Sequence, residues 1–122
     1  DEDSATVIAA GITVLEALKA HDELKSKNIG LRVIDAYSVQ PLDVKTIARE
    51  VAQTGGRVVV AEDHFPGGGL GEAVAAALAG QAKILHLCIR ELPRSGKPGE
   101  LLEAYGISSS HIVRAVHDLV RP

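Results

Sequence analysis

The chain of 122 residues contains no tryptophan, no methionine and a single cysteine. Its aromatic side chains are Tyr37, Phe65 and Tyr105, too few to build the stacked platforms that bind single-stranded nucleic acid. A net charge of −3 provides no long-range attraction for nucleic acid or for an anionic membrane. We therefore expect neither nucleic acid nor a membrane among its partners.

Other absences concern the cell compartment and the extent of the chain. The sequence has no signal peptide and no apolar run of about 18 residues, the length that a membrane helix needs. Cys88 lies in an apolar segment, has no internal disulfide partner, and is expected to be a buried core thiol in a reducing compartment. We therefore predict a cytoplasmic protein. The length of 122 residues and the 46% apolar content suit one domain with a single core. Because methionine is missing even at position 1, we expect this domain, residues 1–122, to be a fragment of a longer chain.

Strand-like and helix-like segments alternate along the sequence. Apolar runs predict strands over residues 5–10, 31–34, 57–61 and 83–89. Helical periodicity predicts a first helix that opens with a capping box of Thr13 and Glu16 and a second helix that starts at Asp43. Further helices are predicted over 72–79, over about 101–105, and after a cap at 108–110. Strand–helix–strand units of this length pair in parallel. We predict an α/β fold, a three-layer α/β/α sandwich with a mainly parallel sheet of four to five strands, the four parallel ones in the order 2-1-3-4.

A glycine-rich loop follows the third predicted strand. It is neither a Walker A loop nor a dinucleotide fingerprint, because no Gly-Lys-Ser/Thr follows it and the third fingerprint glycine is missing. An anion at the next helix start would meet free amides, but Glu62, Asp63 and Glu72 would surround it with negative charge. We therefore expect Gly68 and Gly69 to form a tight turn that presents a surface to another domain or subunit. Direct phosphate binding is the less favoured alternative.

Three further positions, His64, Arg94 and Lys97, are candidates for contacts. His64 beside Asp63 could act as a general base, but neighbours along a strand point to opposite faces, so we favour a hydrogen-bonded interface histidine. The basic segment 90–98 resembles an anion clamp, with Arg94 and Lys97 gripping a phosphate, or a loop that pairs with acidic groups of a neighbouring surface. The remaining histidines and the cysteine show no metal-ligand spacing. We predict no catalytic, cofactor-binding or metal-binding residue in this chain.

Three stretches together resemble the C-terminal domain of transketolases. The first is residues 6–11 with the helix start at 13–18. The second is Ala-Glu-Asp-His at 61–64, leading into Gly-Gly-Leu-Gly-Glu-Ala-Val at 68–74. The third is Pro-Arg-Ser-Gly-Lys-Pro at 93–98 with Glu-Leu-Leu at 100–102 and Tyr-Gly-Ile at 105–107. Residues 32–35 and 39–43 fit the same pattern, and the resemblance, which covers essentially the whole chain, is strongest to animal-type transketolases.

The resemblance implies a homodimeric enzyme of three α/β domains. Such an enzyme uses thiamine diphosphate and a divalent metal, magnesium or calcium, to transfer a two-carbon ketol unit from a ketose phosphate to an aldose phosphate in the pentose phosphate pathway. The two upstream domains hold the cofactor and the sugar phosphates, whereas the third supports subunit association. The resemblance therefore implies a domain that is inactive alone and binds no cofactor itself. It also implies an antiparallel edge strand before Thr6, which nothing before Ala5 could supply.

Two alternatives remain open at this point. The matching domain of a deoxyxylulose-phosphate synthase or of a keto-acid dehydrogenase β-subunit shares the glycine-rich loop, although residues 93–98 argue against it. A free-standing regulatory module could instead bind a small anion through Arg94, Lys97 and the glycine loop. For the domain of a larger enzyme, we expect an exposed apolar patch and concentration-dependent association.

Overall fold

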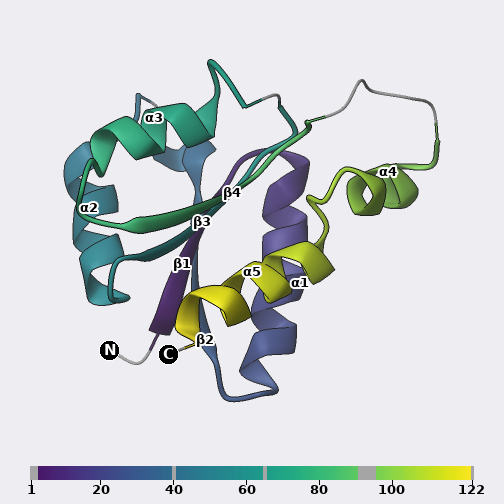
Figure 1. Cartoon of the computed structure of the whole chain (residues 1–122), viewed down its shortest axis with the longest axis horizontal. Coiled ribbons are helices and arrows are strands. Elements are labelled where there is room, and N and C mark those ends of the chain that lie inside the picture. Colours follow the sequence, from purple (N-terminus) through teal and green to yellow (C-terminus); the bar gives the residue numbers. More distant parts are fainter. Residues whose placement is uncertain (1–2, 40, 65, 91–95, 122) are drawn as a thin grey trace.

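We describe residues 3–39, 41–64, 66–90 and 96–121 of a computed structural model of the chain. Strands and helices alternate, as Figure 1 shows. The strands are β1 (Asp3–Ala9), β2 (Gly30–Asp35), β3 (Arg57–Ala61) and β4 (Lys83–Leu87). The helices are α1 (Ile12–Lys25), the short 3₁₀ helix η1 (Ala36–Val39), α2 (Val44–Gln53), α3 (Leu70–Ala77), α4 (Pro98–Ala104) and α5 (Ser109–Val120).

The four strands form one parallel sheet in the order β2-β1-β3-β4. Val7 of β1 lies beside Val33 of β2 and Val59 of β3, and Val59 lies beside Leu85 of β4. The predicted order 2-1-3-4 is therefore confirmed. The described residues contain no antiparallel strand, so the family's edge strand has no counterpart among them.

Helices cover both faces of the sheet, which confirms the three-layer prediction (Figure 1). Alternate side chains of a strand point to opposite faces, so each central strand supplies two cores. In β3, Val59 packs with α1 and α5, whereas Val58 and Val60 pack with α2 and α3. A third, smaller cluster of Ile89, Leu102 and Ile107 holds α4 beyond the sheet.

The predicted capping box at Thr13 is wrong. Helix α1 begins at Ile12, after Gly11 with a φ of 64°, and no side chain caps it. The Thr13 hydroxyl lies 2.7 Å from the carbonyl oxygen of Ala61 and 2.8 Å from that of Ala10. Glu16, which is buried, accepts a hydrogen bond from the amide of Ser109 at 2.9 Å. Both side chains thus bind other elements instead of the first turn of their own helix.

Other boundaries shift by a few residues. β1 starts at Asp3 instead of residue 5, and β4 ends at Leu87 instead of residue 89. α3 starts at Leu70, two residues before the prediction, and α4 starts at Pro98, about three residues before it. The two helix shifts follow from proline at the first helical position of α4 and from the carboxylate of Glu62, which binds the first amides of α3.

Candidate functional site at the carboxyl edge of the sheet

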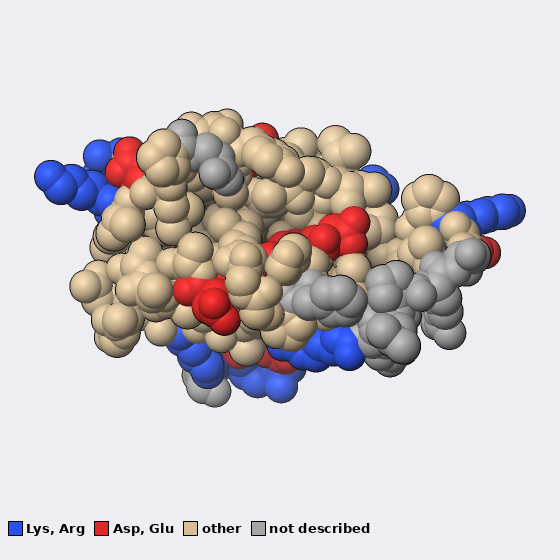
Figure 2. All heavy atoms as spheres, turned by 90° about the horizontal axis from the view of Figure 1, so that it is seen from above, with Lys and Arg blue, Asp and Glu red and all other residues tan. Residues whose placement is uncertain are grey.

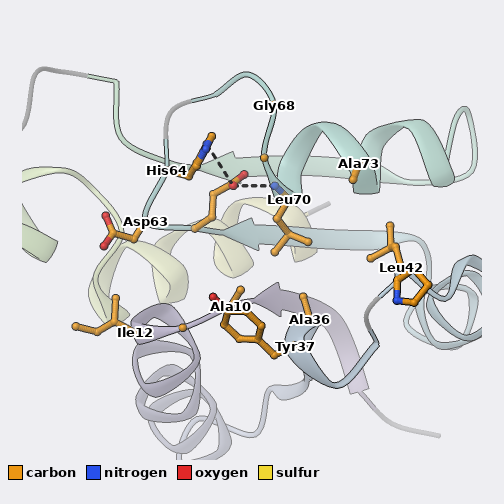
Figure 3. Close-up of a pocket in the computed structure, with 14 residues that line it drawn as sticks. Ala10, Ile12, Ala36, Tyr37, Leu42, Asp63, His64, Gly68, Leu70 and Ala73 are labelled. Carbon is orange, nitrogen blue, oxygen red and sulfur yellow. Dashed lines mark hydrogen bonds and ion pairs between the residues drawn. The ribbon is translucent and has the colours of Figure 1, made fainter.

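A hollow of about 650 Å³ lies at the carboxyl ends of β1, β2 and β3. The chain leaves β1 towards α1 on one face of the sheet and leaves β3 towards α3 on the other face. The hollow therefore lies at the topological switch point, where α/β proteins commonly bind ligands. Ile12 and Tyr37 form part of its wall, and Asp63, His64 and Gly68 lie on its opposite side (Figure 3).

The best-defined group at this edge is the carboxylate of Glu62, directly after β3. The residue is 4% exposed and lies among hydrogen-bond donors. Its Oε1 accepts from the amide of Leu70 at 2.8 Å, and its Oε2 accepts from the amide of Gly71 at 2.6 Å. Nε2 of His86, on the neighbouring strand β4, lies 2.5 Å from the same Oε2. Glu62 thus binds the first amides of α3, which in many α/β proteins bind a phosphate.

Glycines of the loop leave room for this arrangement. A Cβ at Gly69 would overlap the carboxylate of Glu62, and a Cβ at Gly71 would overlap the ring of His86. Gly68 has a φ of 72°, a conformation that other residues rarely adopt. The close approach of Glu62 and His86 therefore accounts for glycine at positions 69 and 71. That the loop presents a surface to another domain or subunit stays a prediction.

His64 lies at the rim of the hollow and is half exposed. Its Nδ1 is 4.0 Å from Oε1 of Glu62, while the side chain of Asp63 points away from the imidazole ring (Figure 3). Asp63 therefore does not orient His64. Strand alternation is not the reason, because β3 ends at Ala61 and both residues lie in the loop after it. An interface role for His64 stays a prediction.

Of the two residues of the predicted anion clamp, the structure describes only Lys97. Lys97 is exposed at the start of α4, where its amide lies 3.4 Å from Oε1 of Glu100, and it is not among the residues that line the hollow. Arg94 lies outside the described residues. A role for Lys97 and Arg94 in binding an anion stays a prediction.

Metal-ligating and nucleophilic side chains are scattered. Within the described ranges, no group of three or more His, Cys, Asp or Glu residues could hold a metal ion.

Cys88 is buried, as predicted. Burial raises the pKa of its thiol, and Nη1 of Arg90 lies 2.7 Å from its Sγ. No helix in the described part of the chain is long and apolar enough to cross a membrane.

Sequence reasoning missed the pairing of Glu62 with His86. The interpretation treated Glu62 only as a charge that would repel a phosphate and gave His86 no role. One signal was available: Glu62 ends an apolar strand and precedes a glycine-rich loop and a helix, which places a carboxylate near the helix start. No sequence signal would have placed His86, because that depends on the register of β3 with β4, in which Val60 lies beside His86.

A doubly wound parallel sheet with a glycine-rich loop at its switch point defines a large class of α/β domains. Within that class, residues 1–112 match the family described as "Transketolase, C-terminal domain". The chain belongs to this family.

Named relatives of similar sequence support the assignment to this family. Transketolase-like protein 1 of Bos taurus is 49% identical over 120 residues, which cover 97% of this chain and 20% of the relative. Transketolase of Mus musculus is 46% identical over 121 residues, which cover 98% of this chain and 19% of the relative. The predicted resemblance to animal-type transketolases is confirmed, and the chain spans about a fifth of the length of these relatives.

Solved structures share the fold. A split-gene transketolase, described as an inactive β4 tetramer, has a TM-score of 0.85 and 33% identity, with 98% of this chain and 40% of that chain covered. A transketolase from Campylobacter jejuni has a TM-score of 0.66 and 21% identity, with 97% of this chain and 17% of that chain covered. The second comparison supports the fold alone.

Proposed function

We propose that this chain is the C-terminal domain of a homodimeric transketolase of the cytoplasm. The whole enzyme would transfer a two-carbon ketol unit from a ketose phosphate to an aldose phosphate in the pentose phosphate pathway. The observation that carries the proposal is the 45–52% identity to transketolases and transketolase-like proteins over 93–98% of the chain. The same relatives favour a transketolase over a deoxyxylulose-phosphate synthase or a keto-acid dehydrogenase.

In this proposal the domain supports assembly and takes no direct part in the chemistry. Transketolases require thiamine diphosphate and a divalent metal. A diphosphate needs free hydrogen-bond donors, and a metal ion needs a cluster of ligating side chains. Glu62 already binds the α3 amides that would otherwise suit a diphosphate, and the described residues form no cluster of metal ligands. The described residues therefore do not fit the cofactor, and in this proposal thiamine diphosphate, with magnesium or calcium, belongs to the upstream domains.

The electrostatics of the carboxyl edge argue against a free-standing anion-binding module. Figure 2 views the molecule onto the loops at the top of Figure 1. Acidic groups lie near the middle of this face, whereas Lys and Arg side chains lie at its margins. An anion there would meet negative charge and a helix start that is already bound by Glu62.

An activity assay tests the proposal. We expect the full-length protein, supplied with thiamine diphosphate and Mg²⁺, to transfer ketol units between sugar phosphates, and the 122-residue chain at equal molarity to transfer none. Ketol transfer by the 122-residue chain would show that it contains catalytic groups. A full-length protein that is inactive with every pair of sugar phosphates would contradict the assignment to transketolase.

Calorimetry separates the alternative module from the proposed domain. We expect a flat trace when sugar phosphates are titrated into the 122-residue chain. A saturable, salt-sensitive heat that the Arg94→Ala variant abolishes would favour the anion-binding module instead.

A further inference from the structure

Helix α1 carries a row of exposed apolar side chains. Ile12, Leu15 and Leu18 are 39%, 60% and 47% exposed, and their spacing of three residues places them along one side of the helix. Single exposed apolar residues are common on protein surfaces, but a contiguous row marks an interaction site.

The row borders a groove between α1 and α4. A hollow of about 670 Å³ is lined by the three α1 residues and by Pro98 and Leu102. A second hollow of about 280 Å³, mostly apolar, adjoins it, because Ile12, Pro98 and Leu102 line both. We call the two hollows together the α1–α4 groove.

Asp63 gives the groove an uncompensated negative charge. This exposed residue lines the smaller hollow and has no hydrogen-bond or ion-pair partner among the described residues. Other charged side chains of the groove do have partners: Lys19 pairs with Glu16, Asp22 lies 3.2 Å from His21, and Glu103 accepts from Ser108.

We propose that the α1–α4 groove docks the upstream part of the same longer chain, through an apolar ridge and a lysine or arginine that pairs with Asp63. This inference rests on the proposed function. The matched family is a C-terminal domain, and the matched segment is about a fifth of the relatives' length, so most of such an enzyme lies upstream of this segment. Arginine is also enriched in protein interfaces, where it pairs well with carboxylates.

A second copy of the domain is the competing occupant. Two copies joined at this groove would need a basic group to meet Asp63. Among the described residues of the groove the only basic side chain is that of Lys19, which already pairs with Glu16 at 3.0 Å. The charges therefore favour a different partner surface.

Hydroxyl-radical footprinting of the full-length protein and of the 122-residue chain tests the proposal. We expect oxidation of Leu15 and Leu18 to fall by about fivefold or more in the full-length protein, because an interface core excludes water. Val44, which is 45% exposed on α2 across the sheet, is the matched control and should oxidise equally in both proteins. Equal oxidation of Leu15 and Leu18 in both would overturn the proposal. Protection of Leu15 and Leu18 that grows with the concentration of the 122-residue chain alone would also overturn it, in favour of a second copy. Association of that chain with both leucines still oxidised would use another surface and would leave the groove to the upstream part.

Two variants of the full-length protein test the chemistry of the contact. Leu15→Lys should return the oxidation of Leu18 to its level in the 122-residue chain, whereas Val44→Lys should not change it. Asp63→Asn should weaken protection of Ile12 and remove its dependence on salt, because the charge pair is lost. Unchanged protection in both Leu15→Lys and Asp63→Asn would refute the proposed contact. Urea unfolding of the 122-residue variants checks that these exposed changes leave the fold intact.

The ketol-transfer assay keeps this inference distinct from the proposed function. Protection of Leu15 and Leu18 in a full-length protein that transfers no ketol unit would support the groove and overturn the proposed function. Ketol transfer by a protein in which both leucines remain unprotected would overturn the groove and support the function.

Discussion

Helices α2 and α3 lie on the same face of the sheet, and each begins with amides bonded to a carboxylate. At α2 the carboxylate belongs to Asp43, the residue directly before the helix, whose Oδ1 accepts from the amide of Thr46 at 3.1 Å. At α3 it belongs to Glu62, which precedes the bonded amides of Leu70 and Gly71 by eight and nine residues. Asp43 is exposed, whereas Glu62 is buried.

The difference shows that two caps of similar chemistry contribute differently to stability. Water can replace Asp43 at the exposed start of α2, so its loss leaves no group without a partner. Water cannot easily replace Glu62, which joins the start of α3 to the end of β3 and to His86 on β4. The first cap stabilises one helix, whereas the second holds three elements of the carboxyl edge together.

The largest expected effect comes from removing the buried carboxylate. The Glu62→Ala substitution leaves two amides and the His86 ring without their acceptor, and we expect the free energy of unfolding to fall by about 3–5 kcal/mol. Urea unfolding of the 122-residue chain at pH 7 measures the change.

Glu72 provides the matched control, since it is an exposed glutamate in the first turn of α3, the helix whose amides Glu62 binds. Glu72→Ala should cost only about 0.5 kcal/mol, the typical contribution of an exposed charge near a helix end. Equal losses in the two variants would mean that burial does not distinguish the two glutamates.

A smaller effect is expected from filling the space beside His86. Gly71→Ala places a Cβ on the His86 ring, so the ring must move away from Glu62. We expect a loss of about 1–3 kcal/mol, as for other overpacked sites, although alanine is the better helix former. Differential scanning calorimetry of the variant checks the expectation.

Gly99→Ala in α4 is the control, because nothing lies within 4 Å of a Cβ there. This substitution should be neutral or stabilise by up to about 1 kcal/mol. If Gly71→Ala behaves in the same way, the packing of Gly71 against His86 does not restrict residue 71.

Features that depend on residues close in the sequence were predictable, whereas the long-range pairing of Glu62 was not. The strands and their parallel pairing follow from apolar runs and from the lengths between them, which are local properties of the chain. The sheet order follows from the doubly wound pattern of such folds. The α2 cap was also predictable, because Asp43 and Thr46 are three residues apart and bond within one turn. The hydrogen bond between Glu62 and the imidazole ring of His86 was not predictable, because His86 is 24 residues away on another strand.

Long-range contacts also explain the wrong prediction at α1. Thr13 and Glu16 have the spacing of a capping box, yet Thr13 bonds to Ala61, 48 residues away, and Glu16 to Ser109, 93 residues away. Buried carbonyl and amide groups need hydrogen-bond partners. Here the carbonyl of Ala61 and the amide of Ser109 bond to these two side chains, so the capping box does not form.

The candidate site was also predictable only where it depends on local sequence. The position of His64, Gly68 and Gly69 at the carboxyl edge follows from the strand that precedes them. The separation of Lys97 from the hollow depends instead on where α4 packs.

The smallest expected effect concerns the acid dependence of the exposed cap. Hydrogen bonds from the side chain and the amide of Thr46 lower the pKa of Asp43 below its ordinary value of 3.8. A carboxyl group whose pKa is lower in the folded than in the unfolded state contributes stability above the unfolded value and loses it as the pH falls through the folded value. The side-chain amide introduced by the Asp43→Asn substitution would still accept the hydrogen bond from the backbone but would carry no charge. The urea midpoint of the wild-type chain should therefore exceed that of Asp43→Asn slightly at pH 7, and the difference should vanish as the pH falls below 3.8. A difference that persists unchanged in acid would mean that the charge of Asp43 contributes nothing to the cap, and an NMR titration of its carboxyl carbon would then show an ordinary pKa.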